Sequence, residues 1–130
     1  MKMRTNDLKK YAKVVKREKE LDRVIIAKVV GVTFDDRQEV LQEVCDTTKV
    51  KLQRDRRNQY DPYAVEVLVS LDHHWLQAGY LSSHMSKKIS KVLDSGQKLD
   101  VKVHKKLGGC YSEHTDEFLN HGLEVSISPK

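Results

Sequence analysis

The sequence contains few of the residues that mark several large protein classes. Of its 130 residues only two are cysteine and two proline, six are glycine, and 6% are aromatic. Two cysteines at unrelated spacing, Cys45 and Cys110, cannot form a disulfide framework, which favours a reducing compartment. No apolar run approaches the ~20 residues of a membrane helix, and the charged start leads into no signal-like stretch. We therefore expect a cytoplasmic protein that does not contact a membrane.

The formal net charge of +5 is unevenly distributed. Residues 1–30 contain ten Lys or Arg and four Asp or Glu, whereas residues 31–130 contain fourteen and fifteen. Because residues 31–130 are almost neutral as a whole, a nucleic-acid site within them requires local clustering of cations. Such a cluster surrounds Asp55 and consists of Lys49, Lys51, Arg54, Arg56 and Arg57. A solvated surface is the alternative explanation of this cluster.

Apolar residues that alternate with polar ones predict a mainly β protein with some α-helix. The β-branched run at 24–32 predicts a strand buried on both faces. Further strands are predicted at 49–53, 65–71, 75–81, 98–104 and 123–128. About six short strands with two inserted helices suggest a bent sheet or a partly closed barrel. Residues 108–121 lack periodicity and are expected to form a loop or a loose hairpin.

Three segments have apolar residues at helical spacing. The segment 6–20 is basic, and we assign residues 1–22 to an N-terminal helical extension and 23–130 to the single domain. A short helix follows Asp36, which stands in capping-box spacing with Glu39. The helix at 84–94 begins after a serine cap at Ser82 or Ser83 and ends before Gly96.

The sequence lacks the common catalytic motifs. Gly108-Gly109 is followed by cysteine rather than by the lysine of a phosphate-binding loop. A zinc site could be assembled from four residues, but their spacing does not fit one: His104, Cys110, His114 and His121. Asp35, Asp36 and Glu39 suggest a nuclease cluster, although helix capping explains two of them. We expect no catalytic residues, no metal and no cofactor.

The most informative segment runs from residue 52 to residue 65. A strand ends in a basic turn, and Asn58-Gln59-Tyr60-Asp61-Pro62 leads directly into the next strand. Asn, Asp and Pro are turn formers, but a turn does not explain tyrosines interleaved with arginines.

The order of motifs along residues 24–106 resembles the HIRAN domain family. The matching segments are Val30-Gly31-Val32-Thr33-Phe34 with Arg37-Gln38, then Leu52-Gln53-Arg54-Asp55, then Asn58 to Val67, and Gly79-Tyr80-Leu81 before a helix. The resemblance implies an OB-like or SH3-like β-barrel that captures the 3′ end of single-stranded DNA, in DNA repair or replication processing.

The resemblance also implies roles for individual residues. Tyr60 is expected to stack on a terminal base, and Asp61 to accept a hydrogen bond from the 3′-hydroxyl group, which a phosphate at the same position could not donate. Phe34 is expected either to cover another side of the base or to be a core residue at the end of a strand. Tyr80 is expected to line the same pocket, with Gly79 allowing a backbone to come close. The predicted phosphate contacts are Lys51, Arg54, Arg56 and Arg57.

Two other functions remain open at the level of sequence. The domain could be an adaptor that recruits a helicase or nuclease partner. It could also be a small metal-dependent nuclease. We favour the non-catalytic DNA-binding module.

Overall fold

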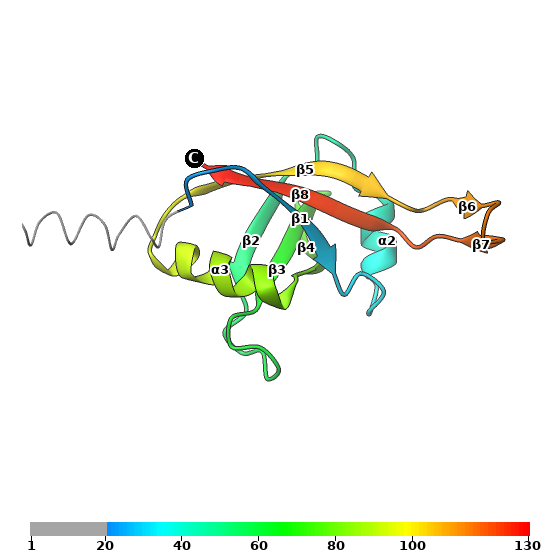
Figure 1. Cartoon of the computed structure of the whole chain (residues 1–130). Coiled ribbons are helices and arrows are strands. Elements are labelled where there is room, and N and C mark those ends of the chain that lie inside the picture. Colours follow the sequence, from blue (N-terminus) through cyan, green and yellow to red (C-terminus); the bar gives the residue numbers. More distant parts are fainter. Residues whose placement is uncertain (1–20) are drawn as a thin grey trace, which may run out of the picture.

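The computed structural model describes residues 21–130, which form a curled sheet with two helices (Figure 1). In chain order the elements are β1 (Ile25–Val30), α2 (Arg37–Gln42), β2 (Val50–Arg54), β3 (Val65–Leu71), β4 (His74–Leu81), α3 (Ser83–Asp94), β5 (Leu99–Leu107), β6 (Tyr111–Ser112), β7 (Glu117–Phe118) and β8 (Gly122–Pro129). The predicted helix at 6–20 lies outside the described residues. Among residues 21–130 no helix is long and apolar enough to span a membrane.

Six strands form one antiparallel sheet in the order β2-β3-β4-β1-β8-β5. A bridge between Lys49 and Lys102 brings the two edges together, so that the sheet curls into a half-barrel. The predicted mainly β, OB-like barrel of about six strands with two inserted helices is confirmed.

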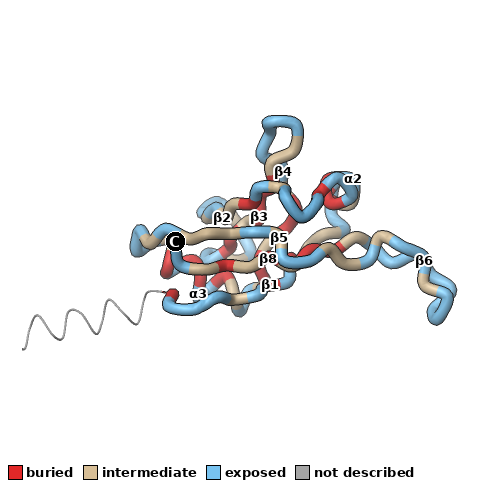
Figure 2. Tube along the Cα trace, turned by 90° about the horizontal axis from the view of Figure 1, so that it is seen from above, coloured by how far each residue is buried: buried red, intermediate tan, exposed pale blue. Residues whose placement is uncertain are grey.

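The core fills the inside of this curl (Figure 2). Alternate residues of a strand point to one face, and the inward residues of β3 and β8 are fully buried. These residues are Val65, Val67, Val69, Leu123, Val125 and Ile127. Helix α3 adds Ile89 and Val92. Leu21 also joins the core, and its N–H and C=O groups bond the side chain of Gln97 at 2.8 and 2.9 Å.

The signals that bound α3 are confirmed, whereas those at α2 are not. Ser82 Oγ accepts a hydrogen bond from the N–H of Met85, and Gly96 follows the helix with φ +84°. Asp36 occupies the N-cap of α2, but its side chain makes no capping bond. The chain enters α2 through a turn that gives Asp36 φ −96° and ψ 16°, outside the extended conformation of a usual cap.

The prediction that the first strand is buried on both faces is wrong. Ala27 and Val29 are buried, but Val24, Ile26 and Val30 are exposed. In the curled sheet only the inner face of β1 meets the core, so every second residue of the strand points outward and stays exposed.

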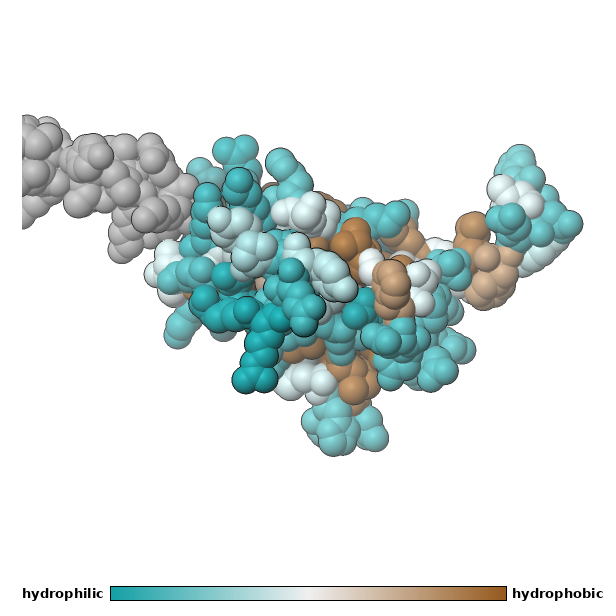
Figure 3. Space-filling view, turned by 90° about the horizontal axis from the view of Figure 1, so that it is seen from below, coloured by the Kyte–Doolittle hydropathy of each residue, from teal (hydrophilic) through white to brown (hydrophobic). Residues whose placement is uncertain are grey.

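Residues 108–121 form an ordered arm. Strands β6 and β7 pair Tyr111 with Phe118, and the hairpin stands clear of the barrel (Figures 1 and 3). Gly108 and Gly109 at its base have φ +63° and +72°. A Cβ on Gly108 would overlap the main-chain carbonyl of Asn120, so glycine is required there.

Candidate nucleic-acid interface

The loop between β2 and β3, residues 55–64, is closed by main-chain hydrogen bonds. The N–H of Asp55 donates to the carbonyl of Ala64 at 2.9 Å, which extends the β2–β3 ladder by one pair. The N–H of Asn58 donates to the carbonyl of Asp55 at 3.3 Å, and that of Ala64 to the carbonyl of Asp61 at 3.2 Å. The loop therefore has a defined conformation.

Asn58 organises the tip of this loop. Its Oδ1 accepts hydrogen bonds from the N–H groups of both Tyr60 and Asp61, each at 2.9 Å. Its Nδ2 donates to Asp55 Oδ2 at 3.4 Å. Asparagine suits this position because its short amide can accept from the backbone two and three residues further along the chain. One side chain thus fixes the backbone that carries the predicted binding pair.

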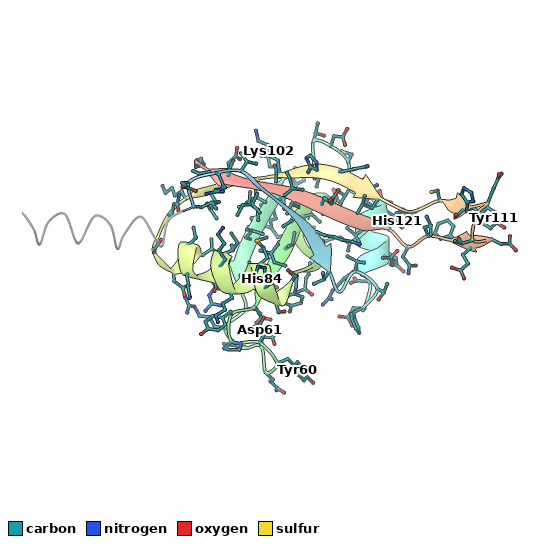
Figure 4. All side chains as sticks on the ribbon, in the orientation of Figure 1. Tyr60, Asp61, His84, Lys102, Tyr111 and His121 are labelled. Carbon is teal, nitrogen blue, oxygen red and sulfur yellow. The ribbon has the colours of Figure 1, made fainter. Side chains whose placement is uncertain are left out.

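The side chain of Tyr60 extends from the tip of the loop into solvent (Figure 4). Tyr60 is 95% exposed, the highest fraction among the exposed large hydrophobic residues of the described chain. An apolar ring with both faces open, on a backbone held by Asn58, has the form of a stacking platform.

Asp61 lies nearer to the barrel than Tyr60 and is half-buried. Its Oδ1 accepts a hydrogen bond from the N–H of Tyr63 at 2.8 Å. Among residues 21–130 no hydrogen bond is formed to Oδ2. One carboxylate oxygen is thus used to orient the side chain, and the other remains able to accept a bond.

Tyr80 connects the loop to β4. Its hydroxyl group donates to Asp55 Oδ2 at 2.8 Å. Burial raises the pKa of the Tyr80 phenol, and the bond to the Asp55 carboxylate acts in the same direction. The phenol therefore remains protonated at neutral pH and keeps donating to the loop.

Arg37 packs beneath two aromatic rings, and the sequence analysis did not assign it to the site. Its Cζ lies 5.9 Å from the ring centroid of Phe34 and 5.3 Å from that of Tyr80. The guanidinium donates to the carbonyl of Gly31 at 2.6 Å and to Gln77 Oε1 at 2.7 Å. Arg37 is 8% exposed, and its Nε has no partner among the described residues. The signal that could have found it is its place three residues after Phe34.

Phe34 lies in the turn between β1 and α2 and is 65% exposed. Its N–H donates to the carbonyl of Gly31 at 3.4 Å, and its own carbonyl accepts from the N–H of Arg37 at 3.2 Å. Gly79 allows close approach of a backbone, because a Cβ there would lie 2.4 Å from the carbonyl oxygen of Val30. The approaching backbone is therefore that of β1.

The structure does not bring the predicted phosphate contacts together. Lys51 Nζ lies over the ring of Trp75 on the outer face of the sheet. Arg54, three residues further along β2, points to the opposite face and is bound to Asp94 of α3 at 3.3 Å. Residues separated by an odd number in a strand face opposite sides.

Two of the arginines are engaged within the domain. Arg54 also donates to the carbonyl of Pro62 at 3.1 Å, so that it ties the loop to α3. Arg56 bonds the same oxygen of Asp94 at 2.8 Å but stays largely exposed. Arg57 is exposed.

The alternative metal sites are not assembled. Within residues 21–130 no group of three or more His, Cys, Asp or Glu side chains is arranged to hold a metal ion. Asp35 instead lies 3.8 Å from Arg37, in a loose ion pair.

The curled sheet and its helices define an OB-like domain, and two solved structures share it. A protein from Lactobacillus plantarum superposes with a TM-score of 0.54 at 23% identity, over 83% of this chain and 99% of that one. The HIRAN domain of human HLTF superposes with a TM-score of 0.51 at 18% identity, over 82% and 76%. No curated protein matches the sequence.

The HIRAN domain model matches residues 22–128, and the chain belongs to the HIRAN domain family. The resemblance inferred from the ordered motifs is thereby confirmed. Members of this family bind nucleic acids and are generally non-catalytic.

Proposed function

We propose that this domain captures the 3′-hydroxyl end of single-stranded DNA without cleaving it, and that it acts in DNA repair or replication processing. The observation that supports the proposal most strongly is the Asn58 side chain, which fixes the backbone of Tyr60 and Asp61 while Tyr60 remains fully open to solvent. Stacking of one base on an aromatic ring is worth about 1–3 kcal/mol and tolerates any base.

The carboxylate of Asp61 supplies the discrimination between termini. It attracts a ligand only where a hydrogen-bond donor stands opposite, and a free 3′-hydroxyl is such a donor. A 3′-phosphate would place negative charge there, at a cost of about 1 kcal/mol at 4 Å in water and about 4 kcal/mol at an effective dielectric of 20. Because Oδ1 is already held by Tyr63, Oδ2 is the atom that meets the terminus.

The test compares oligonucleotides that differ only at one end. Fluorescence anisotropy should show at least tenfold weaker binding, about 1.4 kcal/mol, for a 3′-phosphorylated strand than for its 3′-hydroxyl twin. A strand phosphorylated at the 5′ end serves as the charge control and should bind like the unmodified strand. Equal affinities for both 3′ termini would remove Asp61 from this role.

Two variants test the roles of Asp61 and Tyr60 separately. Asp61→Asn keeps an Oδ1 acceptor for the Tyr63 N–H but removes the charge, so the preference for a 3′-hydroxyl should shrink. Tyr60→Ala should weaken every strand by about 5–150-fold without affecting stability, because the ring is exposed. Tyr63→Ala, at an exposed tyrosine of the same loop, is the matched control. Unchanged binding by Tyr60→Ala would contradict the proposal.

An adaptor role that recruits a helicase or nuclease is a second candidate. The observation in its favour is the β6–β7 arm, in which the register-paired residues Tyr111 and Phe118 are both exposed, away from the proposed DNA site. Replacing both by serine should leave DNA affinity unchanged and abolish partner recruitment if the arm serves that role. Incubating end-labelled DNA with magnesium or manganese tests the nuclease alternative, because only a nuclease would accumulate product.

A further inference from the structure

Trp75 and Lys51 form an exposed pair on the outer face of the sheet. Trp75 is 43% exposed, and Lys51 Nζ lies 4.4 Å from the centroid of its ring. Trp75 of β4 is paired with Ser70 and Lys51 of β2 with Leu68, so the pair spans the central strand β3. A flat π-surface beside a mobile cation provides what one nucleotide of a single strand requires, a stacking partner for its base and a positive charge for its phosphate.

A β-bulge places this pair on the same face as the candidate site. The register of β3 and β4 shifts between Val67/Gly79 and Leu68/Gln77, which leaves Ala78 as an extra residue. Without this residue, the odd separation of Trp75 and Tyr80 would direct them to opposite faces. With it, both share the outer face.

Side-chain contacts link the residues of this face that lie around Tyr80. Arg37 packs on the Tyr80 ring and donates to Gln77, and Gln77 in turn donates to Glu66 Oε2 at 2.8 Å. The other oxygen of Glu66 accepts from Gln53 Nε2 at 2.9 Å. Because Glu66 is negative, a strand crossing here turns its bases and not its phosphates toward the sheet.

The strand geometry also gives the distance between Trp75 and Tyr80, which lies next to the loop of the candidate site. Trp75 and Tyr80 pair with Ser70 and Glu66 of β3, which lie four residues apart, or about 13 Å at ~3.3 Å per residue. A stacked single strand covers this distance in about four nucleotides at ~3.4 Å each.

We propose that Trp75 and Lys51 form a second nucleotide-binding site, which takes a base and phosphate of the same strand about four nucleotides to the 5′ side of its captured end. The distance of this second site from a captured 3′ end rests on the proposed function. The binding of single-stranded nucleic acid at Trp75 does not. Lys51 leaves the ring to pair with the phosphate as the base stacks, since base stacking is stronger than an exposed cation–π contact.

The test exploits the fact that Trp75 is the only tryptophan in the chain. An eight-nucleotide 3′-hydroxyl oligothymidine should quench the tryptophan fluorescence as it binds. A three-nucleotide strand, whose binding is followed by competition, should bind without quenching because it does not reach Trp75. Equal quenching by both lengths, or none by the longer, would overturn the inference.

Variants give a second readout. Trp75→Ala and Lys51→Gln should each weaken the eight-nucleotide strand roughly tenfold, about 1.4 kcal/mol, and leave the three-nucleotide strand unchanged. Trp75→Phe should retain most of the affinity because it keeps an aromatic ring. Leu76→Ala, at the next residue and also exposed, is the matched control and should have no effect. Equal loss for both lengths would contradict a separate second site.

The two proposals can fail independently. If 3′-phosphorylated and 3′-hydroxyl octamers bind and quench alike, end capture is refuted and the site at Trp75 stands. If the octamer prefers a 3′-hydroxyl but neither quenches nor responds to Trp75→Ala, end capture stands and the second site is refuted.

Discussion

Replacement of Asn58 by alanine tests whether the loop is preorganised for binding. The variant loses two hydrogen bonds of 2.9 Å to the N–H groups of Tyr60 and Asp61. Fixing the backbone of one residue costs about 1–2 kcal/mol, so ordering these two residues on binding should cost about 2 kcal/mol in the variant. We therefore expect about 30-fold weaker binding of a 3′-hydroxyl strand, measured by anisotropy. Stability should fall by only about 1 kcal/mol, because water replaces part of each bond.

A double-mutant cycle shows whether Asn58 acts through the loop. In the Tyr60→Ala background, which lacks the ring, Asn58→Ala should reduce the binding free energy by at least about 1 kcal/mol less than it does in the wild-type protein. Trypsin supplies a readout that needs no DNA, since Arg56 and Arg57 should be cleaved faster in the Asn58→Ala variant. Gln59→Ala is the neighbouring control. Effects of Asn58→Ala and Tyr60→Ala that add within about 0.5 kcal/mol, together with unchanged trypsin cleavage, would refute this reasoning.

Three further predictions follow from the charges and thiols. Arg54→Ala should destabilise the domain by about 1–2 kcal/mol in urea, because it removes the tie between the loop and α3, while Arg56→Ala should cost less than about 0.5 kcal/mol. The pKa of the Cys45 thiol is lowered to about 7, mainly by the hydrogen bond with Thr47. The rate of Cys45 alkylation should therefore reach half its maximum near pH 7. Thr47→Val should move the midpoint of this pH profile upward. A log–log salt slope near −2 is expected for about three phosphate contacts on a single strand, and a slope near −6 would show that the basic residues 1–20 dominate.

The sequence allowed prediction of the strands because most of them are covered on one face only. The alternation at 65–71 and 123–128 survives in the structure because each second side chain enters the core. The β1 run failed as evidence of burial on both faces, because β-branched residues favour a strand whether or not its outer face is covered. The Asp36–Glu39 spacing failed as a capping box because the preceding turn, and not the spacing, sets the cap conformation.

The candidate site was only partly predictable, because some of its contacts join residues that are far apart in the chain. Tyr60 and Asp61 are neighbours in the chain, so a local motif could reveal them together. The contact of Arg37 with Tyr80 joins α2 to β4 across 43 residues of chain, and no local pattern shows this contact. Arg54 belongs to a basic cluster in the sequence, but in the structure it forms an ion pair with Asp94, which the fold brings close from the end of α3.

The bulge at Ala78 is the feature on which the layout of the whole outer face depends. Strict alternation along β4 would set Trp75 and Gln77 on one face and Tyr80 on the other, so a reading of the sequence alone separates the tryptophan from the predicted pocket. The only local sign of the irregularity is Gly79, whose close contact with the Val30 carbonyl excludes any side chain. Because the extra residue returns Tyr80 to the face of Gln77 and Trp75, one surface joins the loop that holds Tyr60 to the far end of β4. The register shift therefore puts Tyr80 and Trp75 on the same face, which the proposed second nucleotide-binding site requires.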